Sequence, residues 1–321
     1  MITEISISNY KSVKDQKFSL GSVNLFVGAP GSGKTNIIEA LGIAAAAHDD
    51  ALDYDSLVKR GITVEKPSLM TNRNTACDEI QVAWFEKSSW KKAKLACENM
   101  DDLKAPWTDI SWNDPEYIKK INNLITFIGD GTIEGEYPFK DEAKNATLNA
   151  AFRGSRNFRD YLIYNINLDA LQDRANVSDK QPLGIFGEGI TKLLSKFTEE
   201  QLQEIKSYDY LSWTGDTPPD AENLSVLFFL SLFIMGRRTP ATFAIDNIDA
   251  LIKPDLCCKL VNSIAQQTVK QNKQILITTS NPSIAKGLDI QDPEQKLFIV
   301  KLNNDGNTVV EELKDGTKIE L

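Results

Sequence analysis

The stretch that decides the fold is Gly28-Ala29-Pro30-Gly31-Ser32-Gly33-Lys34-Thr35, which has the spacing G-x-x-x-x-G-K-[ST]. It follows residues 22–27, an alternating run of β-formers, and precedes residues 36–44, where apolar residues recur at helical spacing. A strand that leads into such a loop and a helix that leaves it aim backbone N–H groups at an anion. The stretch therefore predicts a site for a nucleoside triphosphate; the alternative is a chance glycine turn.

The predicted site uses different atoms for phosphate and for metal. Lys34 is expected to reach the β and γ phosphates, and the hydroxyl of Thr35 to bind Mg²⁺. A second acid follows the apolar run at residues 242–245, where Asp246 ends a predicted strand in the Walker B pattern. An Asp at a strand end can also cap a helix, but the nearby loop favours a metal ligand. The residues predicted to contact ATP are Gly28, Pro30, Gly31, Ser32, Gly33, Lys34, Thr35 and Asn36, with Mg²⁺ on Thr35 and Asp246.

Composition limits the class of protein. The chain has 321 residues, with 36 Lys and Arg against 45 Asp and Glu, so its formal charge of −9 excludes a strongly basic nucleic-acid coat. Its four cysteines lack C-x-x-C spacing and are expected to be reduced. The start has no signal-peptide pattern, and the longest apolar stretch, residues 224–235, is shorter than the roughly 20 residues of a membrane span. We expect a cytoplasmic protein with no membrane partner.

The last third of the chain alternates strand and helix patterns, which is typical of a mostly parallel sheet covered on both faces. Ligands bind such sheets at the carboxyl ends of the strands. The predicted strands are residues 241–246, 274–279, 296–302, 308–313 and 317–321, and the predicted helices are residues 221–235, 255–271 and 282–288.

The first half begins with strand patterns at residues 2–8 and 16–20 and later has a hairpin pattern at residues 80–86 and 91–97. Residues 98–150 are hard to interpret; their tryptophans, Trp107 and Trp112, suggest a small core, with a binding platform as the alternative. We therefore divide the chain into a head, residues 1–50 and 155–321, and an insertion, residues 51–154, made of the hairpin and an irregular or helical region.

Several segments resemble the SMC/RecF/OLD group of ABC-class ATPases, whose members often occur in bacterial anti-phage defence. The resemblance implies an α/β fold: an ABC-type P-loop head with a mostly parallel central sheet, an antiparallel β lobe and an inserted α/β region. It also implies a homodimer or higher oligomer held by ATP, with a separate effector, such as a nuclease, as partner. The matching segments are residues 5–12, the loop at residues 28–35, the Walker B and D-loop layout at residues 243–254, and the switch-loop position at residues 278–282.

Two positions depart from that family pattern. The Glu that orients the attacking water is replaced by Asn247, which cannot accept a proton near neutral pH. The switch histidine is replaced by Ser280, and the one histidine of the chain, His48, is expected at the surface or at a helix end. The signature segment, residues 219–223, lacks glycines, and Gly187-Glu188-Gly189 is too far upstream to replace it. The predicted catalytic pair is therefore Asn247 and Ser280, in a slow ATPase.

The main alternative is a RecF- or SMC-like DNA-binding repair ATPase. Its candidate surface combines Arg153, Arg156 and Arg159 with Phe152 and Phe158, although a solvated helix face explains those arginines more simply. A transporter's nucleotide domain is disfavoured because the signature glycines are missing. A GTPase is disfavoured because the chain has no N-K-x-D motif.

Overall fold

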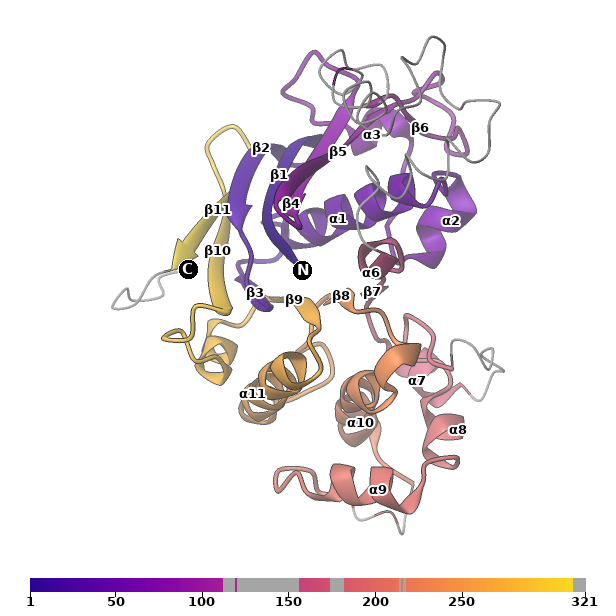
Figure 1. Cartoon of the computed structure of the whole chain (residues 1–321), viewed down its shortest axis with the longest axis vertical. Coiled ribbons are helices and arrows are strands. Elements are labelled where there is room, and N and C mark those ends of the chain that lie inside the picture. Colours follow the sequence, from indigo (N-terminus) through magenta and orange to yellow (C-terminus); the bar gives the residue numbers. More distant parts are fainter. Residues whose placement is uncertain (112–118, 120–155, 174–181, 214, 216–217, 314–321) are drawn as a thin grey trace, which may run out of the picture.

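The computed structural model of the chain describes residues 1–111, 119, 156–173, 182–213, 215 and 218–313. Two sheets lie on either side of the helix α1 (Lys34–His48), and further helices cover the far side of the central sheet (Figure 1). Of the sequence predictions, Trp112, Phe152, Arg153 and residues 317–321 fall outside the described residues, as do the side chain of Arg156 and most of residues 98–154.

The central sheet has the order β11-β10-β3-β9-β8-β7. All neighbours pair in parallel except β10 and β11, so the predicted mostly parallel sheet is confirmed. The predicted Walker B strand, β8, lies beside β9, while β9 separates it from β3. The strands are β3 (Val23–Val27), β7 (Ile163–Tyr164), β8 (Thr242–Ile245), β9 (Gln274–Thr279), β10 (Gln295–Leu302) and β11 (Thr308–Leu313).

Both faces of this sheet are buried, which explains its continuous apolar strands. In β3, Leu25 packs in the core with α10 (Ala221–Ile234) and α11 (Pro254–Lys270), whereas Phe26 packs in the core with α1. Because α1 lies between two sheets, it is buried on all sides rather than amphipathic, and the charged Glu39 is among its buried residues.

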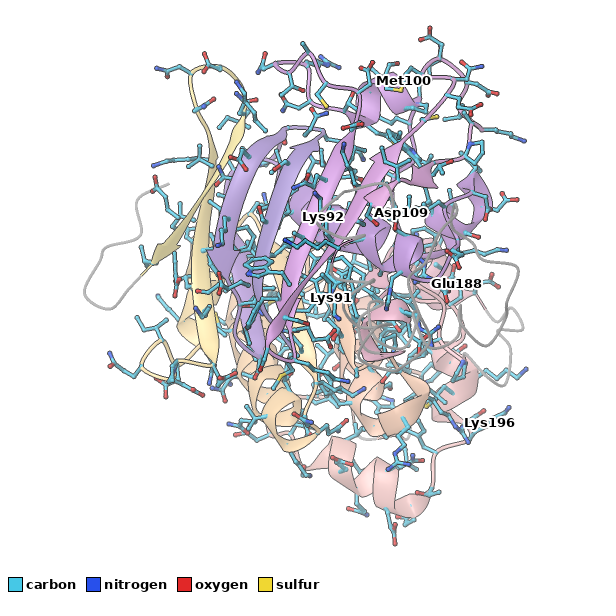
Figure 2. All side chains as sticks on the ribbon, turned by 45° about the horizontal axis from the view of Figure 1, so that its top comes forward. Lys91, Lys92, Met100, Asp109, Glu188 and Lys196 are labelled. Atoms are coloured by element: carbon cyan, nitrogen blue, oxygen red, sulfur yellow. The ribbon has the colours of Figure 1, made fainter. Side chains whose placement is uncertain are left out.

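The second sheet is antiparallel, with the order β2-β1-β4-β5-β6. Strand β4 pairs with β1 from Ile2 to Ser8, so the hairpin that we had assigned to the insertion completes the antiparallel lobe. The hairpin turn uses Lys87 and Ser88, both with positive φ, as a tight right-twisted turn requires. Figure 2 shows Lys91 and Lys92 on β5 of this sheet. Its strands are β1 (Ile2–Tyr10), β2 (Val13–Ser19), β4 (Ile80–Glu86), β5 (Ser89–Ala96) and β6 (Thr108–Asp109).

Short helices fill the connections. The segment predicted as a helix at residues 282–288 is the 3₁₀ helix η3 (Pro282–Gly287), and Gly189 precedes α8 as a turn and helix start. The remaining elements are α2 (Tyr54–Lys59), α3 (Pro67–Met70), α6 (Arg156–Arg159), α7 (Leu168–Gln172), α8 (Ile190–Leu194), α9 (Glu199–Lys206) and the 3₁₀ helix η2 (Gly236–Arg238).

Several single residues settle smaller predictions. His48 ends α1, as expected, but it is buried, with its ring centroid 6.1 Å from that of Trp84. Trp107 is buried, in agreement with a core role. All four cysteines are free thiols, as expected, and Cys77 is exposed rather than packed in the core. In the part of the chain that the structure describes, no helix is both long and apolar enough to cross a bilayer.

Candidate nucleotide site

The glycine-rich loop joins the carboxyl end of β3 to the first turn of α1 (Figure 1). Its conformation is held by Lys34, whose ammonium donates hydrogen bonds to the carbonyls of Gly28 at 2.8 Å and Ala29 at 2.9 Å. Burial lowers the pKa of Lys34, while the nearby carboxylates of Asp246 and Asp249 raise it. A bound phosphate would offer this ammonium the negative partner that two neutral carbonyls do not supply.

The loop itself fits a chain of phosphates. Among the described residues, the buried hydroxyl of Ser32 has no hydrogen-bond partner, so it is a donor awaiting an acceptor. Gly31 has φ +78° and faces open space, which lets a ligand approach the backbone. At Gly33, with φ +95°, a Cβ atom would collide with the hydroxyl of Thr308. These features leave room for a phosphate at Gly31 and Ser32, and the phosphate contacts of Gly28, Pro30 and Gly31 to Asn36 remain predictions.

Asp246 follows β8 and is only 3% exposed. Its carboxylate accepts hydrogen bonds from the hydroxyls of Thr278 at 2.5 Å and Thr35 at 3.1 Å, and from two amides at 3.3 Å, those of Asn165 and Asn247. Burial raises the pKa of Asp246, and the hydroxyls of Thr278 and Thr35 partly offset that rise. The predicted metal ligands, Thr35 and Asp246, are thus in direct contact, with the oxygen donors that Mg²⁺ prefers.

Asn247 occupies the position after the Walker B acid. Its φ is +52°, a left-handed conformation that Asn tolerates better than most residues. Its backbone N–H donates to the hydroxyl of Thr278 at 2.9 Å, and its amide points back to Asp246. The other predicted catalytic residue, Ser280, is exposed at the end of β9. The catalytic roles of both residues remain predictions.

Three residues that the sequence did not single out complete the site: Ser12, Thr308 and Asn165. The amide of Asn36 donates to Ser12 at 2.6 Å, the hydroxyls of Ser12 and Thr308 are 2.6 Å apart, and Thr308 donates to the carbonyl of Ser32 at 3.0 Å. This chain of hydrogen bonds ties the loop to both ends of the described chain. Asn165 is the third missed position; it directly follows β7, a two-residue strand that the sequence did not predict, so no signal in the sequence marked it.

The segment in the signature position begins α10. Asp220 caps this helix by accepting a hydrogen bond from the backbone N–H of Asn223 at 2.8 Å. Glu222 accepts a hydrogen bond from the N–H of Lys253 at 2.8 Å, so its carboxylate is used within the chain. The segment is therefore a capped helix start without a glycine loop.

Residues 1–212 match the family model of an AAA ATPase domain. The chain belongs to this family. The glycine-rich loop of this AAA ATPase domain and its antiparallel sheet lie inside the matched residues, whereas Asp246 and β9 follow them.

Solved structures give the fold of the whole AAA ATPase domain. It resembles the SMC head domain from Thermotoga maritima, with a TM-score of 0.51 and 12% identity over 98% of this chain and 99% of that one. It also resembles an SmcHead bound to the C-winged helix domain of ScpA, with a TM-score of 0.55 and 13% identity over 98% of each chain. A third similar structure is a Smc head from Pyrococcus furiosus bound to the C-terminal domain of ScpA, with a TM-score of 0.51 and 12% identity over 98% of this chain and 96% of that one. No curated protein matches the sequence significantly. The predicted ABC-type head fold is thus confirmed.

Proposed function

We propose that this AAA ATPase domain binds Mg²⁺ and ATP, hydrolyses ATP slowly, and uses the ATP-bound state as a long-lived dimeric switch. The observation that carries the proposal is Asn247 directly beside Asp246, with an amide where a general base would be needed. Losing a positioned general base typically costs about 10²–10⁴ in rate. The phosphate-binding parts, by contrast, have the donors that a triphosphate needs.

The residues divide the work of binding. Lys34, Ser32 and the loop amides would hold the phosphates, and Thr35 with Asp246 would hold the metal. Bound Mg²⁺ would supply charge neutralisation on the phosphate oxygens. Asn247 can orient a water molecule by hydrogen bonding but cannot remove its proton near neutral pH. Ser280 is exposed, so in the dimer it would be available to a γ-phosphate at the interface.

Dimerisation and partner control are supported by the fold alone. Two of the similar SMC heads are described as bound to domains of ScpA, and a comparable partner surface on this chain would let the ATP state control a separate effector. We propose a cytoplasmic role in anti-phage defence, with an effector such as a nuclease. The resemblance of residues 5–12 and 243–254 to the SMC/RecF/OLD group supports this role.

The alternative, a RecF- or SMC-like repair ATPase that binds DNA, fits the same fold. Phe158 does not belong to the candidate DNA-binding surface, because it is buried against Trp84, with ring centroids 5.0 Å apart, and cannot stack on bases. A DNA titration at several salt concentrations separates the two functions. Binding that weakens steeply with salt favours the repair ATPase.

The experiment that tests the proposal measures ATP affinity, single-turnover hydrolysis and oligomeric state on the same samples. We expect the wild-type chain to bind ATP, to dimerise with it, and to hydrolyse it slowly. Lys34→Ala should lose ATP affinity and ATP-dependent dimerisation together. Rapid hydrolysis that Asn247→Ala leaves undiminished would refute the slow switch, and full ATP affinity in Lys34→Ala would refute the site itself.

A further inference from the structure

A large cavity lies at the edge of the central sheet opposite the glycine-rich loop. It is lined by Leu162, just before β7, and by Pro240 and Ala241, just before β8, so it meets the amino-terminal ends of the two strands whose carboxyl ends meet at Asp246. Its volume is about 1390 Å³. The ends of α1, α10 and α11 and part of α2 complete the walls.

The side chains that line this cavity carry a net positive charge, whereas the chain as a whole is negatively charged. Seven cationic side chains line it against three carboxylates, on a protein whose formal charge is −9. Such a concentration of one sign is unfavourable unless a ligand or counter-ions offset it. The cationic residues are Lys59, Arg60, Arg159, Arg237, Arg238, Lys270 and Lys273, and the carboxylates are those of Asp49, Asp160 and Glu204.

Two of the seven cations build the wall. Lys273 is 5% exposed, and its ammonium donates to the carbonyls of Gly236 and Pro240, each at 3.0 Å, and to the hydroxyl of Thr239 at 2.8 Å. This clamp fixes the turn that carries η2. Arg60 pairs with Asp49 at 2.8 Å and fixes the opposite wall.

The other five cations face the cavity without such partners. Arg237 and Arg238 lie on the clamped turn, Lys59 ends α2 and Lys270 ends α11, and all four are exposed. Within the described residues, none of these four, nor Arg159, forms an ion pair with an Asp or Glu. They are therefore available to a ligand, and the clamp holds two of them on a fixed turn.

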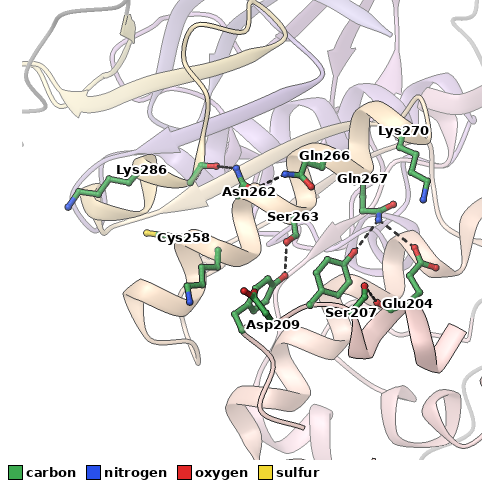
Figure 3. A pocket seen from close by; sticks show the side chains of 14 residues that line it. Glu204, Ser207, Asp209, Cys258, Asn262, Ser263, Gln266, Gln267, Lys270 and Lys286 are labelled. Atoms are coloured by element: carbon green, nitrogen blue, oxygen red, sulfur yellow. Dashed lines mark hydrogen bonds between the residues drawn. The ribbon is translucent and has the colours of Figure 1, made fainter. Parts of the chain in front are cut away.

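A neighbouring groove of about 690 Å³ along α11 offers a contrast (Figure 3). Its three lysines, Lys259, Lys270 and Lys286, are nearly balanced by Glu204 and Asp209. Its tyrosine hydroxyls are also used: Tyr208 accepts from Gln267 at 3.0 Å, and Tyr210 lies 2.8 Å from the hydroxyl of Ser263. The cavity at the sheet edge thus has four more cations than carboxylates, whereas the groove, which shares Lys270 and Glu204 with it, has one more.

We propose that the cavity at the sheet edge is a second anion site, which binds a ligand carrying several phosphate groups. Guanidinium groups suit phosphate because their planar N–H donors match its oxygens in pairs. The cavity exceeds the roughly 300–1,000 Å³ of ordinary small-molecule sites, so it has room for a ligand much larger than one phosphate. A free polyphosphorylated molecule and a nucleic-acid strand both supply this chemistry.

The test measures the binding of two probes at low ionic strength. One is inorganic tripolyphosphate, and the other is a short single-stranded oligonucleotide with a 5′-hydroxyl. Both are titrated into Lys34→Ala, where the glycine-rich loop contributes least. Arg237→Gln with Arg238→Gln is compared with Lys259→Gln with Lys286→Gln, which removes the same charge from the neighbouring groove. If Lys34→Ala does not fold, the wild-type background serves, because the loop contributes equally to both double variants.

We expect the arginine pair to lose at least about tenfold in affinity, since each charge-assisted contact is substantial, and the lysine pair to lose less than about twofold. Tighter binding of the oligonucleotide identifies a strand as the ligand, and tighter binding of tripolyphosphate identifies a free molecule. No binding of either probe, or equal losses in both double variants, would overturn the proposal. So would a poly-glutamate peptide that displaces both probes at lower concentration.

Discussion

The hydroxyl of Thr278 donates a hydrogen bond of 2.5 Å to the carboxylate of Asp246, across the neighbouring strands β9 and β8. The same hydroxyl accepts the backbone N–H of Asn247 at 2.9 Å. One threonine therefore orients both the expected metal ligand and the residue that replaces the general base. This link makes the metal site sensitive to a side chain that would not touch the metal.

The first prediction concerns pH. Burial is the main cause that raises the pKa of Asp246 in the folded state above its ordinary value of 3.8. The protonated carboxyl group therefore stabilises the folded state at pH values below 3.8. This stabilisation is lost as the pH rises through the pKa of the folded state. Metal binding needs the carboxylate, so affinity for Mg²⁺ and ATP should fall as pH drops through that raised pKa. Thr278→Val removes a hydrogen bond that lowers the pKa and should move this fall to higher pH.

Calorimetric titrations with Mg²⁺ and ATP between pH 4.5 and 8 check this expectation. Thr268→Val is the matched control, because Thr268 is also buried but bonds only within α11, to the carbonyl of Ile264. Identical pH profiles for the two variants would contradict the role given to Thr278.

The second prediction concerns the backbone at Asn247, whose φ is +52°. Alanine adopts the left-handed region less readily than glycine does. The free energy of unfolding of Asn247→Ala should therefore be about 1 kcal/mol lower than that of Asn247→Gly. Urea denaturation of the nucleotide-free variants measures the difference. A more stable alanine variant would show that this backbone conformation is not maintained.

The third prediction concerns the buried ion pair of Lys11 and Glu39, whose side chains are 10% and 1% exposed and whose charged atoms lie 2.6 Å apart. Lys11→Ala leaves a buried carboxylate unpaired and should cost about 3 kcal/mol of unfolding free energy. Adding Glu39→Gln removes that charge and should recover part of the loss. Lys301→Ala breaks an exposed pair with Glu311 and should cost less than about 1 kcal/mol. Equal losses for Lys11→Ala and Lys301→Ala would count against this account.

The fourth prediction concerns Thr308, which donates to the carbonyl of Ser32 in the glycine-rich loop. Thr308→Val keeps the shape but removes the donor, and should cost about 1 kcal/mol of stability. Because the lost bond holds the loop, affinity for ATP should also fall severalfold. Urea denaturation and ATP titration together check this; a stability loss with unchanged ATP affinity would mean that the loop holds its shape without Thr308.

The sequence predicted most of the central sheet because its strands are apolar on both faces and its loop has a strict spacing. Strand β9 and the hairpin strand β4 were placed at the bounds observed. The two-residue strand β7 escaped prediction because so short a segment has no periodicity. The segment at residues 282–288 had an apolar pattern that α and 3₁₀ helices share.

The missed parts of the site depend on contacts between distant residues. Ser12 and Thr308 are 296 positions apart, and nothing local marks either one as a neighbour of the loop. The role of Thr278 depends on the register of β8 and β9, which places Ile245 opposite Ile277. The pairing of β4 with β1 is equally non-local, so the hairpin was recognised but not its place in the sheet. The division of the chain into head and insertion remains a prediction.

The strand that leads into the glycine-rich loop, β3, is paired on one side with β10 and on the other with β9. During synthesis on the ribosome, residues 28–35 emerge long before residues 274–308, which supply those flanking strands and Thr308. A growing chain therefore carries the loop without its supports. We therefore expect the loop to bind ATP tightly only once β9, β10 and Thr308 have folded beside it, so nucleotide contributes little to the early folding of the first half.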